Sequence, residues 1–222
     1  DLEAALEEQV AKGYMLRFDP EEAEERYGSQ LSVAALGAIV KDTREDGTCE
    51  LRVIHDGTNG VQVNPRIRVL DGNITPSVED IRTAMGAQAD SGSPHFGLTL
   101  DAKEAHRQVA IRRADWGLLA CRARPGGPVY VNTRGTYGIS SAAYWWGRLA
   151  AGLHRLLLFV LGRDMPLWAM VYADDWDLSA PGGTSIETLV GAVLLLRALG
   201  LPVSWKKLRG GFSYQWLGLE KD

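Results

Sequence analysis

The stretch Leu167-Trp-Ala-Met-Val-Tyr-Ala-Asp-Asp-Trp-Asp-Leu-Ser-Ala180 decides the fold. Strand-forming apolar residues open it, two adjacent carboxylates follow, and a second short apolar run begins at Trp176. This pattern predicts a β-hairpin with Asp174 and Asp175 at its tip. Asp is also favoured in ordinary turns for its local hydrogen bonds, so the pair by itself fits a plain turn better than a site.

A third carboxylate ends another strand-like segment, Phe96-Gly-Leu-Thr-Leu-Asp101. If the two strands lie side by side, Asp101 meets Asp174 and Asp175 at one edge of a sheet. Two like charges about 4 Å apart repel by roughly 4 kcal/mol at an effective dielectric constant near 20. Three such carboxylates therefore need cations to stay ionised together. Ligands that are all oxygen indicate Mg²⁺, which keeps positions open for phosphate oxygens and water.

Tyr172-Ala173-Asp174-Asp175 resembles the Tyr-x-Asp-Asp signature of reverse transcriptases, and Asp101, 73 residues before Asp174, stands where that family carries its first-motif aspartate. The resemblance implies an RNA-directed DNA polymerase of a retrotransposon-like element, a nucleotidyltransferase that adds deoxynucleotides to a primer 3′ end. It also implies two Mg²⁺ ions, which Mn²⁺ can replace, roughly 3.5 to 4 Å apart. Asp101 and Asp174 would hold them, supported by Asp175 and the carbonyl of Ala102, with Tyr172 beneath the primer terminus.

A second family-like segment, Leu51-Arg52-Val-Ile-His-Asp56, precedes Asn64. In the family an Arg four residues before an Asp contacts the incoming triphosphate, and Arg52 is implied in that role. Guanidinium suits phosphate because its fork of donors pairs phosphate oxygens and never loses its charge. The alternative for Arg52 is an exposed strand arginine. The family's second triphosphate ligand, a Lys on the partner strand, has two candidates here, Lys41 and Arg44.

Four further residues are candidates for the nucleotide and template sites. Arg66 and Arg68 lie at strand spacing and would face a template phosphate, or simply carry surface charge. His106, five residues after Asp101, stands at the family's sugar-discriminating position, usually Phe or Tyr. Histidine can block a 2′-hydroxyl or accept one, so the choice between dNTPs and rNTPs stays open, and a surface His is the alternative. Gly138 resembles the glycine of the second palm motif, where backbone approaches the base or sugar.

Two segments after the acidic hairpin complete the resemblance. Lys207, seven residues after Gly200, resembles the lysine of the family's fourth motif and would protonate the leaving pyrophosphate as general acid. Lys206 is the near alternative, and a surface lysine is the default for either. Tyr214-Gln-Trp216-Leu217-Gly218 resembles the aromatic-Leu-Gly hairpin known as the primer grip.

These segments predict an α+β fold, a polymerase palm with a ferredoxin-like antiparallel sheet plus a small fingers subdomain. Residues 1–30 are expected to form two acidic outer helices, residues 31–93 the fingers, and residues 94–222 the palm with a primer-grip-like end. A thumb is absent from this division.

Local signals place the remaining elements. Strands are expected from Val33 to Val40 and from Cys49 to His55, joined by an Asp46-Gly47 turn, and a further strand after Gly200. Ser77 is expected to cap a helix that ends near Ala87, and Ile186 to Leu199 reads as an apolar helix.

Composition bounds the class of protein. With 222 residues, 45% of them hydrophobic, the chain can bury a sizeable core. The net charge of −4 divides into −8 for residues 1–50 and +4 for residues 51–222, which permits a basic groove for an RNA or DNA template with its primer. No apolar run is long enough to span a bilayer. Two cysteines without a CxxC pair suit a reducing, intracellular compartment, nucleus or cytoplasm, and provide no zinc site. Because Asp rather than Met comes first, we expect other domains of a longer polyprotein.

Two other classes compete with the polymerase. One is an inactive or domesticated retroelement remnant that binds nucleic acid without polymerising; the lack of a thumb favours it and the intact carboxylates oppose it. The other is a two-metal nucleotide cyclase on a similar palm, which Lys207 and the primer-grip-like segment disfavour.

Overall fold

The computed structural model describes residues 2–43, 47 and 49–221, and it divides into two compact units. Unit 1 comprises residues 1–71 and 106–145, and unit 2 comprises residues 72–105 and 146–222. The predicted boundaries at residues 31 and 94 divide the chain into successive segments. Each of these units instead consists of two separate stretches, because residues 72–105 pack with the chain from residue 146 onward. Arg44 and Asp46 lie outside the described residues, so the candidate Arg44 and the Asp46-Gly47 turn stay predictions.

A four-stranded sheet of order β1-β7-β6-β2 forms the centre of unit 1. Its β2–β6 pair is parallel and its other pairs are antiparallel. The strands are β1 (Met15–Phe18), β2 (Val33–Ala34), β6 (Ala120–Cys121) and β7 (Val129–Asn132). The two expected N-terminal helices are present as α1 (Leu2–Ala11) and α2 (Pro20–Tyr27), with β1 between them. Four residues are too few for their alternation to reveal β1 in the sequence.

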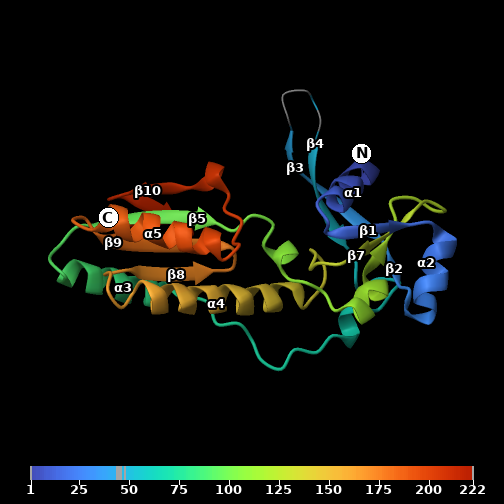
Figure 1. Ribbon diagram of the computed structural model, residues 1–222, viewed down its shortest axis with the longest axis horizontal. Helices are drawn as coiled ribbons and strands as arrows, with labels where there is room; N and C mark the ends of the chain where they lie inside the picture. The colour runs from blue at the N-terminus through green and yellow to red at the C-terminus, as the bar shows by residue number, and fades with distance from the viewer. Residues whose placement is uncertain (1, 44–46, 48, 222) are drawn as a thin grey trace. The chain divides into compact units, whose positions relative to one another are not determined.

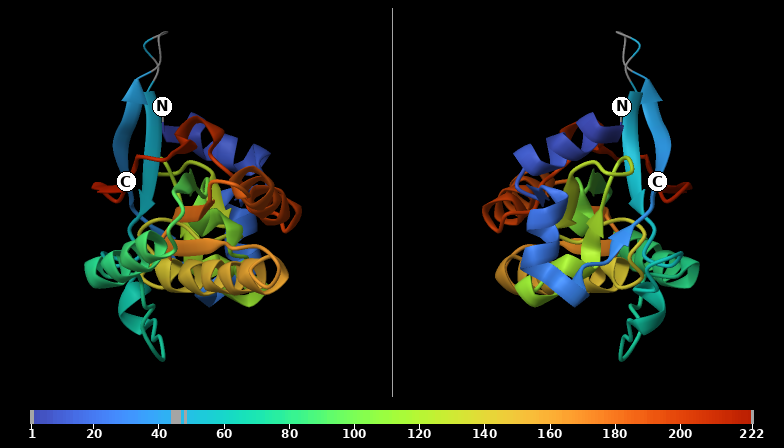
Figure 2. Two further views of the ribbon diagram at one scale, coloured as in Figure 1. Left: turned by 90° about the vertical axis from the view of Figure 1, so that its left-hand side faces the viewer. Right: turned by 90° about the vertical axis from the view of Figure 1, so that its right-hand side faces the viewer.

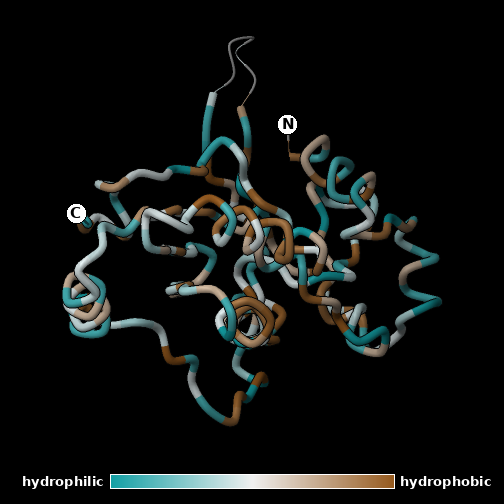
Figure 3. The backbone as a smooth tube through the Cα atoms, turned by 60° about the vertical axis from the view of Figure 1, so that its left-hand side comes forward, coloured by the Kyte–Doolittle hydropathy of each residue, from teal (hydrophilic) through white to brown (hydrophobic). Residues whose placement is uncertain are grey.

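The N-terminal helices contribute apolar residues to the unit 1 core. Leu6 of α1 is 1% exposed and packs in a cluster with Met15, Cys121 and Tyr130. Ala23 of α2 belongs to a second cluster. Figure 3 shows hydrophilic and hydrophobic residues following one another along the turns of α1, beside the N mark. These helices are therefore amphipathic: they carry acidic residues and still bury an apolar face in the core.

A two-stranded ribbon extends from unit 1, as Figures 1 and 2 show. It consists of β3 (Leu36–Thr43) and β4 (Cys49–His55), antiparallel, with an irregularity between Val40 and Asp42. The strand predicted from Cys49 to His55 is confirmed as β4. The strand predicted from Val33 to Val40 is divided: Val33–Ala34 forms β2 of the four-stranded sheet, and β3 begins at Leu36. Short 3₁₀ helices complete the unit: η1 (Gly28–Gln30), η2 (Asn64–Arg66), η3 (Ala105–Gln108, whose first residue belongs to unit 2) and η4 (Arg113–Leu119).

Unit 2 is built on an antiparallel sheet of order β10-β5-β9-β8 (Figure 1). The strands are β5 (His95–Asp101), β8 (Trp168–Tyr172), β9 (Asp175–Pro181) and β10 (Arg209–Gly211). A separate hairpin pairs β11 (Tyr214–Trp216) with β12 (Leu219–Lys221). The helices are α3 (Val78–Asp90), α4 (Ala142–Val160, of which residues 142–145 belong to unit 1), α5 (Ser185–Ala198) and η5 (Trp205–Lys207). The expected mixture of helices and sheets is confirmed, whereas the division into a ferredoxin-like palm and fingers stays a prediction.

Helix boundaries follow the local signals closely. Ser77 caps α3, as predicted, and forms a capping box with Asp80; the helix runs to Asp90 rather than Ala87.

The prediction of a strand after Gly200 is wrong: Val203 makes an isolated bridge with Ala102, and the chain then enters η5. Pro202 has no N–H to donate to a ladder, which limits strand pairing there.

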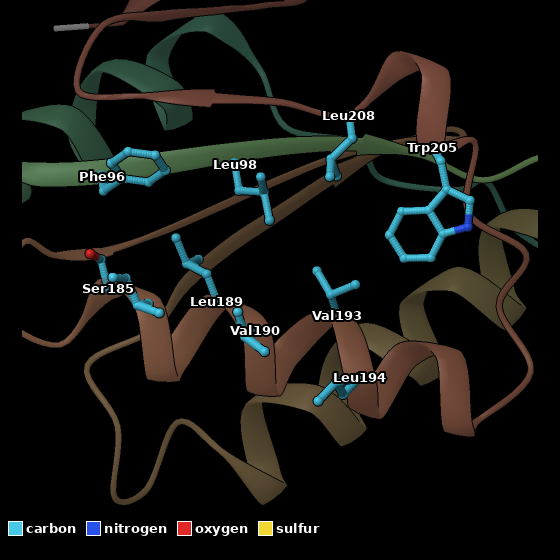
Figure 4. A pocket seen from close by; sticks show the side chains of 10 residues that line it. Phe96, Leu98, Ser185, Leu189, Val190, Val193, Leu194, Trp205 and Leu208 are labelled. Carbon is cyan, nitrogen blue, oxygen red and sulfur yellow. The ribbon is translucent and has the colours of Figure 1, made fainter.

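The two faces of the unit 2 sheet differ in chemistry because side chains alternate along each strand. Leu98 and Leu100 of β5 lie opposite Leu178 and Trp176 of β9 and form the apolar face. Figure 4 shows side chains of α5 directed toward this face, around an open apolar groove of about 420 Å³. Asp101 alternates with Leu100, so the carboxylates lie on the other face, away from the groove. Among the described residues, no helix has both the length and the apolar character to cross a membrane.

His55 ends β4 inside unit 1 with 1% exposure, and neither ring nitrogen has a hydrogen-bond partner among the described residues. Burial lowers the pKa of His55 to about 4; the positive charge of Arg107 lowers it too, and Asp56 opposes. The folded state therefore holds this imidazole neutral.

We predict that acid destabilises the protein through His55. Since its pKa is near 6.5 in the unfolded chain and about 4 when folded, stability is full above pH 6.5 and is lost as pH falls toward 4. Linkage sets the upper limit of this loss at about 3 kcal/mol. Urea unfolding of wild type and His55→Phe at several pH values measures it, and the difference between the two should grow between pH 7 and 4. Parallel pH profiles for the two proteins would contradict the prediction.

Candidate active site

Three side chains form one row across the unit 2 sheet. Asp101 on β5 pairs with Asp175 on β9, which pairs with Tyr172 on β8. Residues directly opposite each other in antiparallel strands share a face, with Cβ atoms about 4.5 to 5.5 Å apart. Asp101 is 8% exposed and Tyr172 is 41% exposed, so the tyrosine is open to a ligand. The side-by-side strands expected from the sequence are confirmed.

Asp174 lies in a two-residue turn that the surrounding structure holds in place. Ala173, the first turn residue, has φ of +54°, a left-handed conformation that costs about 1–2 kcal/mol for a residue with a Cβ. Trp146 Nε1 donates to Ala173 O at 2.9 Å, and Ala102 N donates to Asp174 O at 2.8 Å. Hydrogen bonds thus hold both backbone carbonyls of the turn, and they fix the position of the backbone from which the Asp174 side chain extends.

Lys207 reaches the row from the segment after α5. Ser204 N donates to Asp101 O at 2.9 Å, and Lys103 N donates to Pro202 O at 2.7 Å, so this segment lies along the end of β5. The 3₁₀ turn η5 then brings Lys207 Nζ to 2.7 Å from Asp101 Oδ2. Both candidate lysines are exposed, and Lys207 is the one whose ammonium contacts a carboxylate of the row.

The carboxylates interact electrostatically. Burial raises the pKa of Asp175, the charges of Asp174 and Asp101 raise it further, and Lys207 opposes them. The hydrogen bond to Asp101 raises the pKa of Lys207, and the three carboxylate charges add to this against the effect of burial. One ammonium group thus faces three carboxylates, and a further cation would lower the repulsion among them.

The donor chemistry of this cluster fits a hard divalent cation, since every side-chain donor is a carboxylate oxygen. Within the described ranges, no three His, Cys, Asp or Glu side chains converge closely enough to hold a metal ion as they stand. Lys207 occupies one oxygen of Asp101, so ligation by that oxygen requires the lysine to move. Ala102, whose carbonyl is the fourth expected ligand, is 1% exposed.

The primer-grip-like segment forms the β11–β12 hairpin. Leu217 and Gly218 are its two turn residues, with φ of +51° and +77°. Left-handed residues at both positions are typical of the type I′ turn that suits tight hairpins. Leu217 is 39% exposed at the tip, whereas Trp216 is 3% exposed. Of these two residues, Leu217 is the one that the free hairpin exposes; contact of Trp216 with a primer stays a prediction.

In unit 1 two nucleotide candidates lie around one aromatic ring. The Arg52 guanidinium lies 5.1 Å from the centroid of Tyr137, and the His106 ring lies 4.7 Å from the same ring with planes tilted by 55°. Arg52 is exposed. Lys41 Nζ is 2.7 Å from Glu50 Oε1, so this candidate already has an acidic partner. No pattern in the sequence indicates that the ring of Tyr137 contacts both Arg52 and His106.

Gly138 has a structural requirement of its own. Its φ is +95°, and a Cβ there would lie 2.0 Å from the carbonyl oxygen of His55. His55 N donates to Tyr137 O at 2.9 Å. Asn64 Nδ2 donates to Gly138 O at 2.8 Å, and Ser140 N donates back to Asn64 Oδ1 at 2.9 Å. The close backbone approach that calls for glycine is thus to the end of β4.

The two template candidates do not share a strand. Arg66 ends the 3₁₀ helix η2, which Pro65 helps to begin, and Arg68 follows in irregular chain. The strand-spacing argument for Arg66 and Arg68 is therefore wrong, although both side chains are exposed.

The candidates divide between the units. Unit 1 contains Arg52, Lys41, His106, Gly138, Arg66 and Arg68; unit 2 contains Asp101, Ala102, Asp174, Asp175, Lys207, Tyr172, Trp216, Leu217 and Gly218. Within unit 2 the carboxylates and Lys207 come together.

Comparison with known proteins supports the fold alone. No protein-family model matches the chain, and no curated protein matches it. Among solved structures it resembles a foamy viral protease-reverse transcriptase (dRH) in complex with double-stranded DNA, with a TM-score of 0.66 and 14% sequence identity over 96% of this chain. This chain spans 31% of that one. The fold is therefore similar to that of a viral reverse transcriptase.

We predict that Trp146→Phe loosens the acidic turn. The variant keeps an aromatic ring but loses the donor to Ala173 O, which should cost about 1–3 kcal/mol. Hydrogen exchange at the Ala102 amide, which donates to Asp174 O, should accelerate when followed by NMR. Trp145→Phe is the control, because Trp145 is 51% exposed in the same helix. Equal exchange in the two variants would refute a specific role for Trp146.

A second prediction separates folding from nucleotide contact at Gly138. Gly138→Ala should destabilise the chain by about 3 kcal/mol or more, because its Cβ meets backbone and its φ is left-handed. Gly86→Ala, in the interior of α3 with open space around the new Cβ, should stabilise by up to about 1 kcal/mol. Urea denaturation measures both. A Gly138→Ala protein as stable as wild type would leave nucleotide contact as the reason for the glycine.

Proposed function

We propose that this chain is the catalytic portion of an RNA-directed DNA polymerase, extending a primer 3′ end along an RNA or DNA template. The observation that carries the proposal is the juxtaposition of Asp101 and Asp175 in register, with Asp174 in the adjoining held turn. The fold likeness to a viral reverse transcriptase supports it. Carboxylates placed together on a polar sheet face are otherwise unfavourable.

Asp101, Asp174 and Asp175 would hold two Mg²⁺ ions, which Mn²⁺ can replace. When bound, the ions supply activation of the primer 3′-hydroxyl and neutralisation of charge on the triphosphate. Lys207 would leave Asp101 as the ligands assemble and turn toward the leaving pyrophosphate. A lysine ammonium is protonated at neutral pH, so that Lys207, once released from Asp101, can donate a proton as the pyrophosphate departs.

Other residues would bind and orient the substrates. Arg52, held over the ring of Tyr137, would pair the triphosphate oxygens through its fork of donors. His106 on the same ring would face the sugar. Tyr172 and the exposed Leu217 would contact the primer strand. Arg66 and Arg68 would contact template phosphates, and contacts of that kind make binding weaken as salt rises.

The second candidate is a nucleic-acid-binding module without catalysis. The observation that favours it is the ion pair between Lys207 and Asp101, together with the lack of a converged metal cluster in the described part of the chain. In a protein of that kind, the Lys207 ammonium would remain bound to Asp101 in place of a metal ion. The two candidates differ in what happens when Asp174 loses its charge.

Primer extension with Mg²⁺ tests the proposal, using matched RNA and DNA templates and either dNTPs or rNTPs. Wild type should extend with dNTPs on RNA. Asp174→Asn should reduce the rate by about 10²-fold or more, because one oxygen ligand loses its charge. Lys207→Ala should reduce it by roughly 10²-fold through loss of the general acid.

Matched controls separate these effects from general damage. Asp164→Asn removes an exposed acid of unit 2, and Lys206→Ala removes the exposed neighbour of Lys207; both should extend primers like wild type. If the wild-type chain binds primer-template without extending it, and Asp174→Asn binds equally well, the binding module replaces the polymerase. The rNTP reactions measure which sugar the chain prefers, the choice that His106 leaves open.

A further inference from the structure

One buried carboxylate holds both strands of the β11–β12 hairpin. Asp177 lies on β9, two residues after Asp175, and is 2% exposed. Lys221 Nζ of β12 lies 2.5 Å from Asp177 Oδ2, with the two side chains 3% and 2% exposed. The Tyr214 hydroxyl of β11 donates to Asp177 Oδ1 at 2.8 Å. We call Asp177, Tyr214 and Lys221 the Asp177 cluster.

The hairpin is also seated on the neighbouring strand β5. A Cβ at Gly97 would lie 1.9 Å from a ring carbon of Tyr214, so the ring occupies the space that a side chain there would need. Burial raises the pKa of the Tyr214 hydroxyl, and the adjacent Asp177 adds to the effect, so the phenol remains a donor. Lys221 Nζ lies 5.3 Å from the centroid of the Tyr214 ring and 5.9 Å from that of Trp216.

Stability alone does not explain a charged pair in this position. Apolar side chains of similar volume often stabilise a core as well as a buried ion pair, or better. What the carboxylate provides is geometry: its two oxygens bind one group from each strand of the hairpin, which restricts the hairpin to one arrangement on β9.

We infer that the Asp177 cluster is a positioning device, which fixes the Leu217–Gly218 turn relative to the row of Asp101 and Asp175 and thereby places the primer strand for extension. The primer as occupant rests on the proposed function. The attachment of the hairpin to the carboxylate-bearing strands is independent of it.

Variants of the cluster test the inference in the full chain. Lys221→Met removes the charge and Lys221→Arg retains it, while Asp177→Leu/Lys221→Met replaces the pair with apolar groups that keep the core filled. Glu220→Gln is the matched control, because Glu220 is an exposed acid on the same strand. Thermal unfolding first identifies which variants fold.

Amide hydrogen exchange of residues 214–221 reports the hairpin without any assay of activity. In Lys221→Met and in the double variant, exchange there should be about tenfold faster or more, with β5 and β9 unchanged. Lys221→Arg and Glu220→Gln should match wild type. Wild-type exchange in a folded double variant would overturn the inference, whatever the activity of the chain.

Primer extension then measures the positioning. At saturating primer-template, kcat should fall by roughly 10²-fold in the double variant, whereas KM for the dNTP should stay nearly unchanged. Lys221→Arg, which keeps the charge, should have the kcat of wild type. A loosened hairpin with wild-type kcat would overturn the positioning role. If wild type itself extends no primer, the proposed function fails, and hydrogen exchange together with primer-template affinity of the same variants still decides whether the cluster fixes the turn.

Discussion

The antiparallel pairing of β5 with β9 is the constraint on which the candidate active site depends. Its register places Asp101 opposite Asp175 on one face and Leu100 opposite Trp176 on the other. Because side chains alternate, a slip of one residue would send the apolar side chains to the polar face and the carboxylates into the core. Burial of Trp176, which is 0% exposed, therefore holds charges together that repel one another.

Local strain and repulsion at this site are compensated by packing nearby. Ala173 adopts a left-handed conformation without being glycine. A buried indole binds its carbonyl, and a strand-end amide binds the carbonyl of Asp174. Lys207 offsets part of the negative charge from a 3₁₀ turn rather than from the sheet. Such strain persists only where the surrounding structure over-determines it, and here that structure is the α4 indole, the end of β5 and the segment after α5.

Features with a local signal could be predicted from the sequence. The acidic hairpin, the strand ending at Asp101 and the helix beginning after Ser77 each follow from periodicity or capping chemistry within a few residues. Contacts between distant residues left no such signal. The Trp146 hydrogen bond to Ala173 and the ion pair of Asp177 with Lys221 join residues 27 and 44 positions apart, and nothing in either local pattern selects the partner.

The interleaved course of the chain has a consequence for biogenesis. Residues 1–71 find their partners only when residues 106–145 have been made, and residues 72–105 wait for the segment after 146. Neither unit can be excised as one continuous fragment, since each consists of two separate stretches. During synthesis, apolar surfaces of the N-terminal helices and of β5 emerge well before the strands that cover them, which is the situation in which partly folded chains aggregate. The slow, long-range closure of both units makes this a chain that should be expressed and refolded whole.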